Sequence, residues 1–146
     1  MNIDDTVIDS LKLKLSQIPK NPTVMTECHN IFAQYMEPYV PMDEGILAHN
    51  ISITPDGVHY LSPYAHYQYV GIIYGPNIPI YENGVIVGWW SPPNKKSTGR
   101  KINYHTDKHS KATREWDKAM LRDKRNAFIK DLSTIIIDYL KGLNND

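Results

Sequence analysis

The hydrophobic period of this 146-residue chain changes twice along its length, and this change limits the fold more than any other feature. Apolar residues recur at three- and four-residue spacing over 7–35 and again over 113–140, which predicts helices. Between these segments they alternate with polar residues, which predicts strands. The order favours an α+β fold, with an antiparallel sheet of two hairpins packed against N-terminal helices and a long C-terminal helix.

Prolines and polar caps indicate where the helices begin and end. The first helix ends before Pro22, and a second begins there with Asn21 as its N-cap. Pro38 stops this second helix because proline cannot donate the next backbone hydrogen bond. The last and longest helix begins between residues 110 and 113. Trp116 starts its apolar stripe, so we expect this side chain to lie in the core.

Two turn signals predict the hairpins. The sequence Pro-Asp-Gly at 55–57 lies inside a predicted hairpin over 50–61. Asn83-Gly84 is the strongest short hairpin signal and lies between two apolar runs over 78–90. Residues 91–104 contain Pro, Ser, Gly and basic residues without any period, so they are predicted to form an exposed loop.

Length and composition favour one domain over 1–146, in which 72–104 is an extended hairpin and loop excursion. No apolar run reaches the roughly 18 residues of a membrane-spanning helix. The acidic N-terminus shows no secretion signal, and the lone Cys28 excludes an intramolecular disulfide. We therefore expect synthesis in the cytoplasm and no membrane partner.

The net charge of zero conceals a strong asymmetry along the chain. Residues 95–125 carry eleven basic and four acidic side chains, whereas residues 1–94 carry three basic and nine acidic ones. This asymmetry suits complementary charged surfaces or a basic face beside an anion, and it also suits an ordinary solvated face. Near Trp89 and Trp90, four basic residues are candidates for contact with a nucleic-acid backbone: Lys95, Lys96, Arg100 and Lys101.

Little in the sequence supports catalysis. It contains no phosphate-binding loop, nucleophile elbow or zinc-protease motif. His105, Asp107 and His109 have a spacing that could hold a metal ion on a helix, so a small metal-dependent nuclease is one alternative. A nucleic-acid-binding or regulatory module is another. We expect no catalytic, metal-binding or cofactor-binding residues and no cofactor.

Tyrosine and tryptophan are frequent, at ten and three, against only two phenylalanines. Their side chains join a large apolar surface to a polar group, which suits surfaces that a partner covers. Tyr64, Tyr67 and Tyr69 lie in a predicted short helix that ends at Gly71. They either cap the edge of the core or form a subunit interface.

Three motifs, in this order and spacing, resemble those of one protein family. Residues 39–47 (YVPMDEGIL) precede the first hairpin, residues 63–71 (PYAHYQYVG) follow it, and residues 112–117 (ATREWD) open the last helix. They resemble the minor capsid, or head–tail joining, proteins of siphophages and prophages of Gram-positive bacteria. One departure is Asn50, where the family usually has Ser. The residues that carry the resemblance are Pro41, Asp43, Gly45, Leu47, Ala65, Gly71 and Trp116.

The first motif also has a local interpretation. Asp43 can accept backbone hydrogen bonds after Pro41, and Gly45 permits a backbone conformation that other residues avoid. These features predict a sharp turn leading directly into the first strand.

The resemblance implies a structural protein of the phage neck, located in the virion, that completes the junction between tail tube and head connector. Copies would form a ring around the DNA channel in the virion and could be monomers in solution. The partners would be further copies, the connector and tail-tube proteins and, transiently and non-specifically, genomic DNA. An adaptor or stopper role is the nearest alternative. The interface candidates are Tyr64, Tyr67, Tyr69, Tyr74, Trp89 and Trp90, and the DNA-channel candidates are the four basic residues Lys95, Lys96, Arg100 and Lys101.

Overall fold

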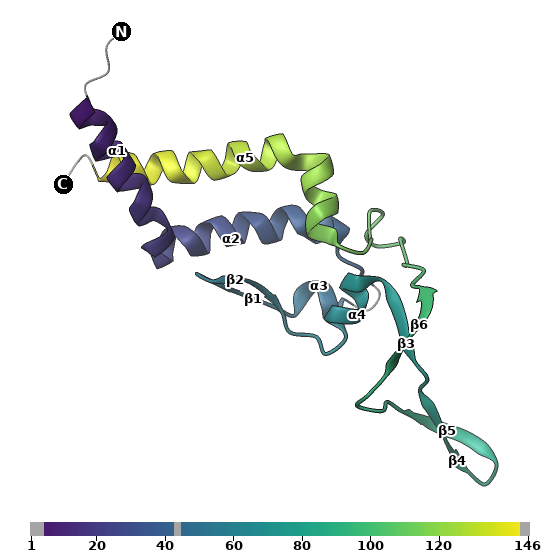
Figure 1. Ribbon diagram of the computed structural model, residues 1–146. Helices are drawn as coiled ribbons and strands as arrows, with labels where there is room; N and C mark the ends of the chain where they lie inside the picture. Colours follow the sequence, from purple (N-terminus) through teal and green to yellow (C-terminus); the bar gives the residue numbers. More distant parts are fainter. Residues whose placement is uncertain (1–4, 43–44, 144–146) are drawn as a thin grey trace.

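The computed structural model describes residues 5–42 and 45–143, and its helices and antiparallel strands confirm the predicted α+β class (Figure 1). The helices are α1 (Asp5–Gln17), α2 (Pro22–Met36), α3 (Ile46–His49), α4 (Ala65–Val70) and α5 (Trp116–Gly142), with short 3-10 helices at Ile18–Lys20 and Glu37–Tyr39. The strands are β1 (Ile51–Thr54), β2 (Gly57–Tyr60), β3 (Ile72–Gly75), β4 (Ile78–Glu82), β5 (Val85–Trp90) and β6 (Lys96–Lys101).

The strands form three separate two-stranded antiparallel sheets, β1–β2, β3–β6 and β4–β5. The prediction of one sheet made of two hairpins was therefore wrong, although both hairpins exist. The β1–β2 hairpin packs against α2, whereas β4–β5 lies at the far end of the molecule (Figure 1). The two hairpins cannot share a sheet because β3 and β6 hold the second one away from the helices.

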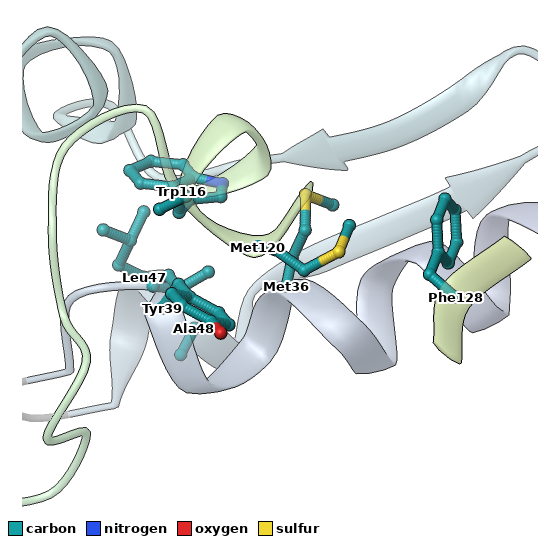
Figure 2. Close-up of a cluster of buried hydrophobic side chains, with 9 residues drawn as sticks. Met36, Tyr39, Leu47, Ala48, Trp116, Met120 and Phe128 are labelled. Atoms are coloured by element: carbon teal, nitrogen blue, oxygen red, sulfur yellow. The ribbon is translucent and has the colours of Figure 1, made fainter. Parts of the chain in front are cut away.

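Helices α2 and α5 lie side by side and form the body of the molecule (Figure 1). The predicted N-cap of α2 is confirmed, because the Asn21 side chain accepts a hydrogen bond from the Val24 backbone nitrogen at 3.1 Å. The core lies where the ends of these two helices meet the chain segment between α2 and β1 (Figure 2). Its buried side chains are Met36, Tyr39, Val40, Leu47, Ala48, Trp116, Ala119, Met120 and Phe128.

Trp116 lies in this core, as its place in the sequence predicted. Trp116 is only 3% exposed, and the rings of Tyr60 and Tyr69 pack edge-on against the indole, with ring centroids 5.1 and 5.0 Å from it. The indole therefore joins three elements, β2, α4 and α5, through aromatic contacts that are favourable beyond their buried area.

Three tyrosines fasten α5 to the rest of the body through hydrogen bonds from their phenol groups. Tyr35 donates to Asp131 at 2.5 Å, Tyr39 to Asp123 at 3.2 Å and Tyr69 to Asp117 at 2.9 Å. These bonds explain part of the excess of tyrosine over phenylalanine, because each ring contributes apolar surface while its hydroxyl satisfies a carboxylate on α5. For these three residues, the tyrosine content reflects internal packing.

Three local predictions differ from the structure. The sharp turn expected at Gly45 leads into α3 instead of a strand, because Gly45 adopts φ +86° and its carbonyl accepts a hydrogen bond from the His49 nitrogen. Residues 96–101 form β6, within the segment predicted to be a loop. The last helix begins only at Trp116, because the preceding backbone bonds elsewhere: the Thr113 nitrogen donates to the Tyr39 carbonyl and the Glu115 nitrogen to the Tyr69 carbonyl.

Burial of Tyr60 gives a testable pH dependence. Burial raises the pKa of this phenol from 10.0 to about 12. The unfolded chain thus ionises first as the pH rises, so the stability that Tyr60 contributes is present below pH 10 and is lost as the pH rises towards 12. We expect the free energy of unfolding to fall over this interval, and Tyr60→Phe to flatten the fall in urea titrations at several pH values. Tyr81→Phe, at a residue that is 61% exposed, is the control.

Among residues 5–42 and 45–143, no helix combines the length and the hydrophobicity that crossing a bilayer requires.

Candidate assembly surface

Residues 72–101 form an arm that projects from the body (Figure 1). Strands β3 and β6 pair to make its stalk, and β4 and β5 make a hairpin at its tip. The tip hairpin packs on itself and makes no extensive contact with any other described helix or strand. The arm is therefore a structural feature that the packing of a single copy does not require.

The base of the arm is fixed to α4 at Gly71. This glycine ends α4 with φ +76°, and its carbonyl accepts a hydrogen bond from the Ile102 nitrogen at 2.9 Å. One turn earlier, the Gln68 carbonyl accepts a hydrogen bond from the Tyr104 hydroxyl at 2.6 Å. These two bonds hold both ends of the arm against the same helix, which sets the direction in which the arm leaves the body.

Gly71 cannot be replaced without strain, which gives a prediction. A Cβ at this position would lie 2.8 Å from Cβ of Arg114 and 2.9 Å from the Tyr104 hydroxyl, in a left-handed backbone. We expect Gly71→Ala to lower the free energy of unfolding by at least about 1–3 kcal/mol, measured by urea denaturation. Gly99→Ala is the matched control, because Gly99 has φ +72° with nothing within 4 Å of an added Cβ. Equal losses in the two variants would contradict the steric explanation.

The stalk is held together by contacts between its strands and with α4. The Thr98 hydroxyl donates to the Ile73 carbonyl at 2.7 Å, and the rings of Tyr67 and Tyr74 pack at a tilt with centroids 4.8 Å apart. The pairing of β3 with β6 shifts register between Ile72 and Tyr74, which increases the local twist. The stalk is therefore braced on the body, whereas the tip is not.

The tip hairpin exposes apolar side chains on both faces. Its turn matches the sequence prediction, with Asn83 at φ +50° and Gly84 at φ +80°. Cross-strand pairing and alternation put Ile78, Ile80 and Trp90 on one face, and Trp89 on the other. An isolated two-stranded hairpin is marginally stable in water. The exposed apolar residues are Ile78, Ile80, Tyr81, Val85, Ile86, Val87, Trp89 and Trp90.

This apolar surface is large enough to be an interface. The eight residues are each roughly half exposed, and over the two faces together they expose about 800 Å², which is comparable to the share of one partner in an interface of standard size. Exposed apolar patches of this size mark surfaces that a partner covers.

The predicted interface tyrosines and tryptophans fall into three groups. Trp89, Trp90 and Tyr64 are exposed, at 59%, 52% and 41%. Tyr67 on α4 and Tyr74 on β3 are partly buried, and their rings pack against each other at a tilt. Tyr69 packs on the core instead.

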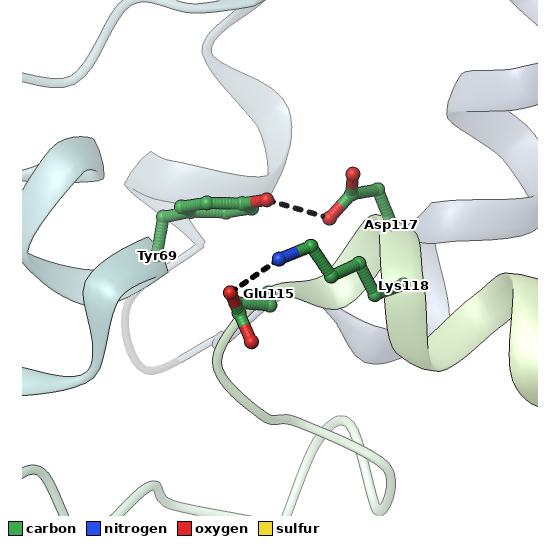
Figure 3. A network of polar contacts seen from close by, with 4 residues as sticks. All are labelled: Tyr69, Glu115, Asp117 and Lys118. Atoms are coloured by element: carbon green, nitrogen blue, oxygen red, sulfur yellow. Dashed lines mark hydrogen bonds and ion pairs between the residues drawn. The ribbon is translucent and has the colours of Figure 1, made fainter.

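Figure 3 shows how Tyr69 is held within the chain: its hydroxyl donates to Asp117, beside an ion pair between Glu115 and Lys118. The hydrogen bond from Lys118 holds the pKa of the Glu115 carboxyl below its usual value, and burial, with Asp117, raises the pKa of the Tyr69 phenol. Tyr69 therefore has intramolecular partners on α5, and its assignment to a subunit interface stays a prediction.

The predicted DNA-channel residues lie along the stalk. Lys96, Arg100 and Lys101 are exposed on β6, and Lys95, just before it, is partly buried. Within the described ranges, none of the four forms an ion pair with a carboxylate. The structure therefore gathers these four charges on β6 and on the residue just before it, close to the apolar tip.

His109 has a structural role that the sequence did not indicate. Its Nδ1 lies 2.7 Å from the carbonyl oxygen of Val40, to which it donates, and its Nε2 lies 3.0 Å from a carboxylate oxygen of Glu37. Both ring nitrogens are thus engaged, and the side chain is largely buried. No group of three or more His, Cys, Asp or Glu within the described residues is arranged to hold a metal ion. His109 therefore connects residues 105–112 to the end of α2. Its ring nitrogens are already engaged by Val40 and Glu37, which disfavours His109 as a ligand of the alternative metal site.

The remaining motif residues support the body. Pro41, Gly45 and Leu47 are buried around α3, and Ala65 opens α4 against the core. Asp43 lies outside the described residues. The described parts of the three motifs thus meet in space: residues 39–42 and 45–47, α4 and the start of α5 pack around Trp116.

Comparison of this chain with protein-family profiles, with curated proteins and with solved structures gives no match.

Proposed function

We propose that this chain is a structural virion protein of the phage neck, which joins the tail tube to the head connector as a ring of copies around the DNA channel. The observation that carries the proposal is the arm, whose tip exposes an interface-sized apolar surface that the chain itself leaves uncovered. The motifs that resemble head–tail joining proteins support it, because they surround Trp116 and set the base of the arm.

A protein that joins two parts of a virion needs surfaces of complementary shape and enough apolar area to bury, and the arm offers both. A braced stalk positions the tip, and the tip supplies aromatic anchors of the kind that dominate binding energy at interfaces. A ring needs two different complementary surfaces on each copy, because closure by rotation is a head-to-tail contact. The arm supplies one of these surfaces.

Adaptor and stopper proteins of the neck meet the same physical requirements, so either role is the nearest alternative within this proposal. The metal-dependent nuclease is disfavoured because His109 is engaged with Val40 and Glu37.

The basic stalk gives the proposal an electrostatic test. If Lys96, Arg100 and Lys101 face the channel, their charges neutralise phosphates as the genome passes. We expect a variant with all three changed to Glu to form complete particles that retain or eject DNA abnormally, measured by ejection in vitro at several salt concentrations. The control changes three basic residues of α5 that lie away from the arm, Arg122, Lys124 and Arg125. Normal ejection by the stalk variant would remove the channel role.

The neck function itself is tested by removing the protein from a phage that carries it. We expect filled heads and separate tails, seen by electron microscopy, and recovery of joined particles when the chain is supplied in trans. Joined particles in its absence would overturn the proposal. The position of a tagged copy, next to the connector or next to the tail tube, separates a tail-completion protein from an adaptor or a stopper.

A further inference from the structure

We infer that a groove beside Trp116 binds an arginine side chain of a partner protein. The groove lies where α2, the β1–β2 hairpin, α4 and the start of α5 meet, and it has a volume of about 470 Å³. The inference goes beyond the proposed function and does not rest on it, because it uses only the geometry and the charge of this groove. The arm, at the other end of the molecule (Figure 1), has no part in it.

Aromatic rings line the groove. Trp116 is almost completely buried and lies at its bottom, while Phe32, Tyr60 and Tyr69 contribute to its walls. The planes of the two phenol rings stand at 67° and 87° to the indole. Rings at such angles present their faces in different directions, so a flat cation can lie on one face while its edge points past the others.

Two carboxylates line the same groove, Asp56 from the β1–β2 turn and Asp117 from the start of α5. Within the part of the chain that the structure describes, no lysine or arginine lines it. Lys118, the next residue after Asp117, forms an ion pair with Glu115 at 2.6 Å (Figure 3). The groove therefore combines negative charge with aromatic surface, and both features are complementary to a cation.

An uncharged apolar side chain would fit this groove poorly because of Asp117. This residue is partly exposed to water, and one of its carboxylate oxygens accepts a hydrogen bond from the Tyr69 hydroxyl at 2.9 Å. An apolar occupant would remove the water without replacing its hydrogen bonds, which is costly for a charged group. A cation whose N–H groups reach the carboxylate replaces those bonds.

Among cationic side chains, arginine matches the lining better than lysine. Its guanidinium is planar, is more weakly hydrated than an ammonium group, packs flat on aromatic rings and donates two parallel hydrogen bonds to one carboxylate. The groove thus offers each kind of contact that this group makes.

The shape of the groove indicates a protein as the source of the arginine. Its bottom is buried at Trp116, whereas its rim is open, since Asp56 and His66 are exposed. Sites for small molecules cover most of their ligand. A groove with an open rim is covered fully only when the side chain extends from a protein surface that closes over it, so we assign the groove to a protein partner.

Two-dimensional NMR of the full chain tests the inference with internal controls. The chain has three tryptophans, and their indole N–H signals report on the groove, through Trp116, and on the tip, through Trp89 and Trp90. Spectra of Trp89→Phe and Trp90→Phe assign the three signals. The probe is the peptide acetyl-Ala-Arg-Ala-amide, whose only charge is the guanidinium. We expect it to shift the Trp116 signal at concentrations up to about 10 mM, which detects a millimolar Kd, and to leave the other two signals unchanged.

Matched probes isolate the contribution of the side chain. Citrulline has nearly the shape of arginine without its charge, and we expect acetyl-Ala-citrulline-Ala-amide to bind the unchanged protein at least about tenfold more weakly. The corresponding lysine peptide should bind at least about threefold more weakly than the arginine peptide, because an ammonium group cannot lie flat on a ring or donate two parallel bonds. Equal affinity for lysine overturns the assignment to arginine.

A double variant tests the carboxylates. Asp56→Asn with Asp117→Asn removes both charges and keeps an acceptor for the Tyr69 hydroxyl. We expect it to bind the arginine peptide at least about tenfold more weakly. Asp138→Asn makes the same change at an exposed position of α5 outside the groove and should leave the affinity unchanged. If the double variant does not fold, the citrulline peptide on the unchanged protein decides the role of charge.

The inference is overturned by an unshifted Trp116 signal, by shifts confined to Trp89 and Trp90, or by equal binding of the citrulline peptide. The last result would mean that the groove takes an uncharged side chain. Head–tail joining enters none of these measurements, so their failure leaves the proposed function as it stands, and failure of the proposed function leaves the groove as a binding site for arginine.

Discussion

Removal of the tip is expected to abolish head–tail joining while leaving the body folded. Gly75 and Lys96 face each other across the stalk, so an Asn-Gly turn can replace residues 76–95 and close β3 onto β6. The tip hairpin adds little to the body, because it makes no extensive contact with it. We expect the free energy of unfolding to change by less than about 1 kcal/mol, whereas joined, infectious particles fall to background.

The control for this excision keeps the arm and changes only its surface. Trp89→Ser with Trp90→Ser retains the turn and the strand pairing but removes the two anchors. We expect this variant to express as a folded protein, by circular dichroism and urea denaturation, and to fail in joining as the excised chain does. Particles that form with the excised chain would show that the tip has no part in assembly, and particles that form with the double variant would show that the two tryptophans are not its anchors.

The sequence predicted those elements whose signals are local. Asn21 and Pro22 begin α2 because the cap and the first turn involve residues three positions apart. Asn83 and Gly84 turn the tip hairpin because two adjacent residues adopt positive φ. Such features depend on short spacings that can be recognised along the chain.

Elements that depend on distant partners could not be predicted in this way. Strand β6 has no apolar alternation because it is exposed throughout, and it exists only through its pairing with β3, about 25 residues earlier. The start of α5 is displaced because Thr113 and Glu115 bond to the backbone of Tyr39 and Tyr69. The role of His109 has the same origin, since Val40 and Glu37 lie far away in sequence.

The candidate site shows the same division. Trp89 and Trp90 were predicted as interface candidates from the resemblance, and both are exposed in the structure. The contacts of Tyr69 with Trp116 and Asp117 could not be predicted, because the fold brings these partners to it. The groove beside Trp116 had no sequence signal, since its walls come from four separate segments.

The two kinds of tryptophan give the sharpest stability contrast in the molecule. Trp116 is 3% exposed and holds the rings of Tyr60 and Tyr69, so Trp116→Ala leaves a cavity that three elements must close. We expect a loss of about 3–5 kcal/mol, measured by urea denaturation, a large share of the about 5–15 kcal/mol that stabilises a domain.

Trp89→Ala makes the same chemical change at a residue that is 59% exposed, and we expect it to alter the free energy of unfolding by no more than about 0.5 kcal/mol. The effect on assembly should not follow the effect on stability. Trp89→Ala should impair joining although the chain is fully folded, because a partner needs the indole. Comparable stability losses in the two variants would mean that the tip is packed within its own chain, and the apolar arm would then require no partner.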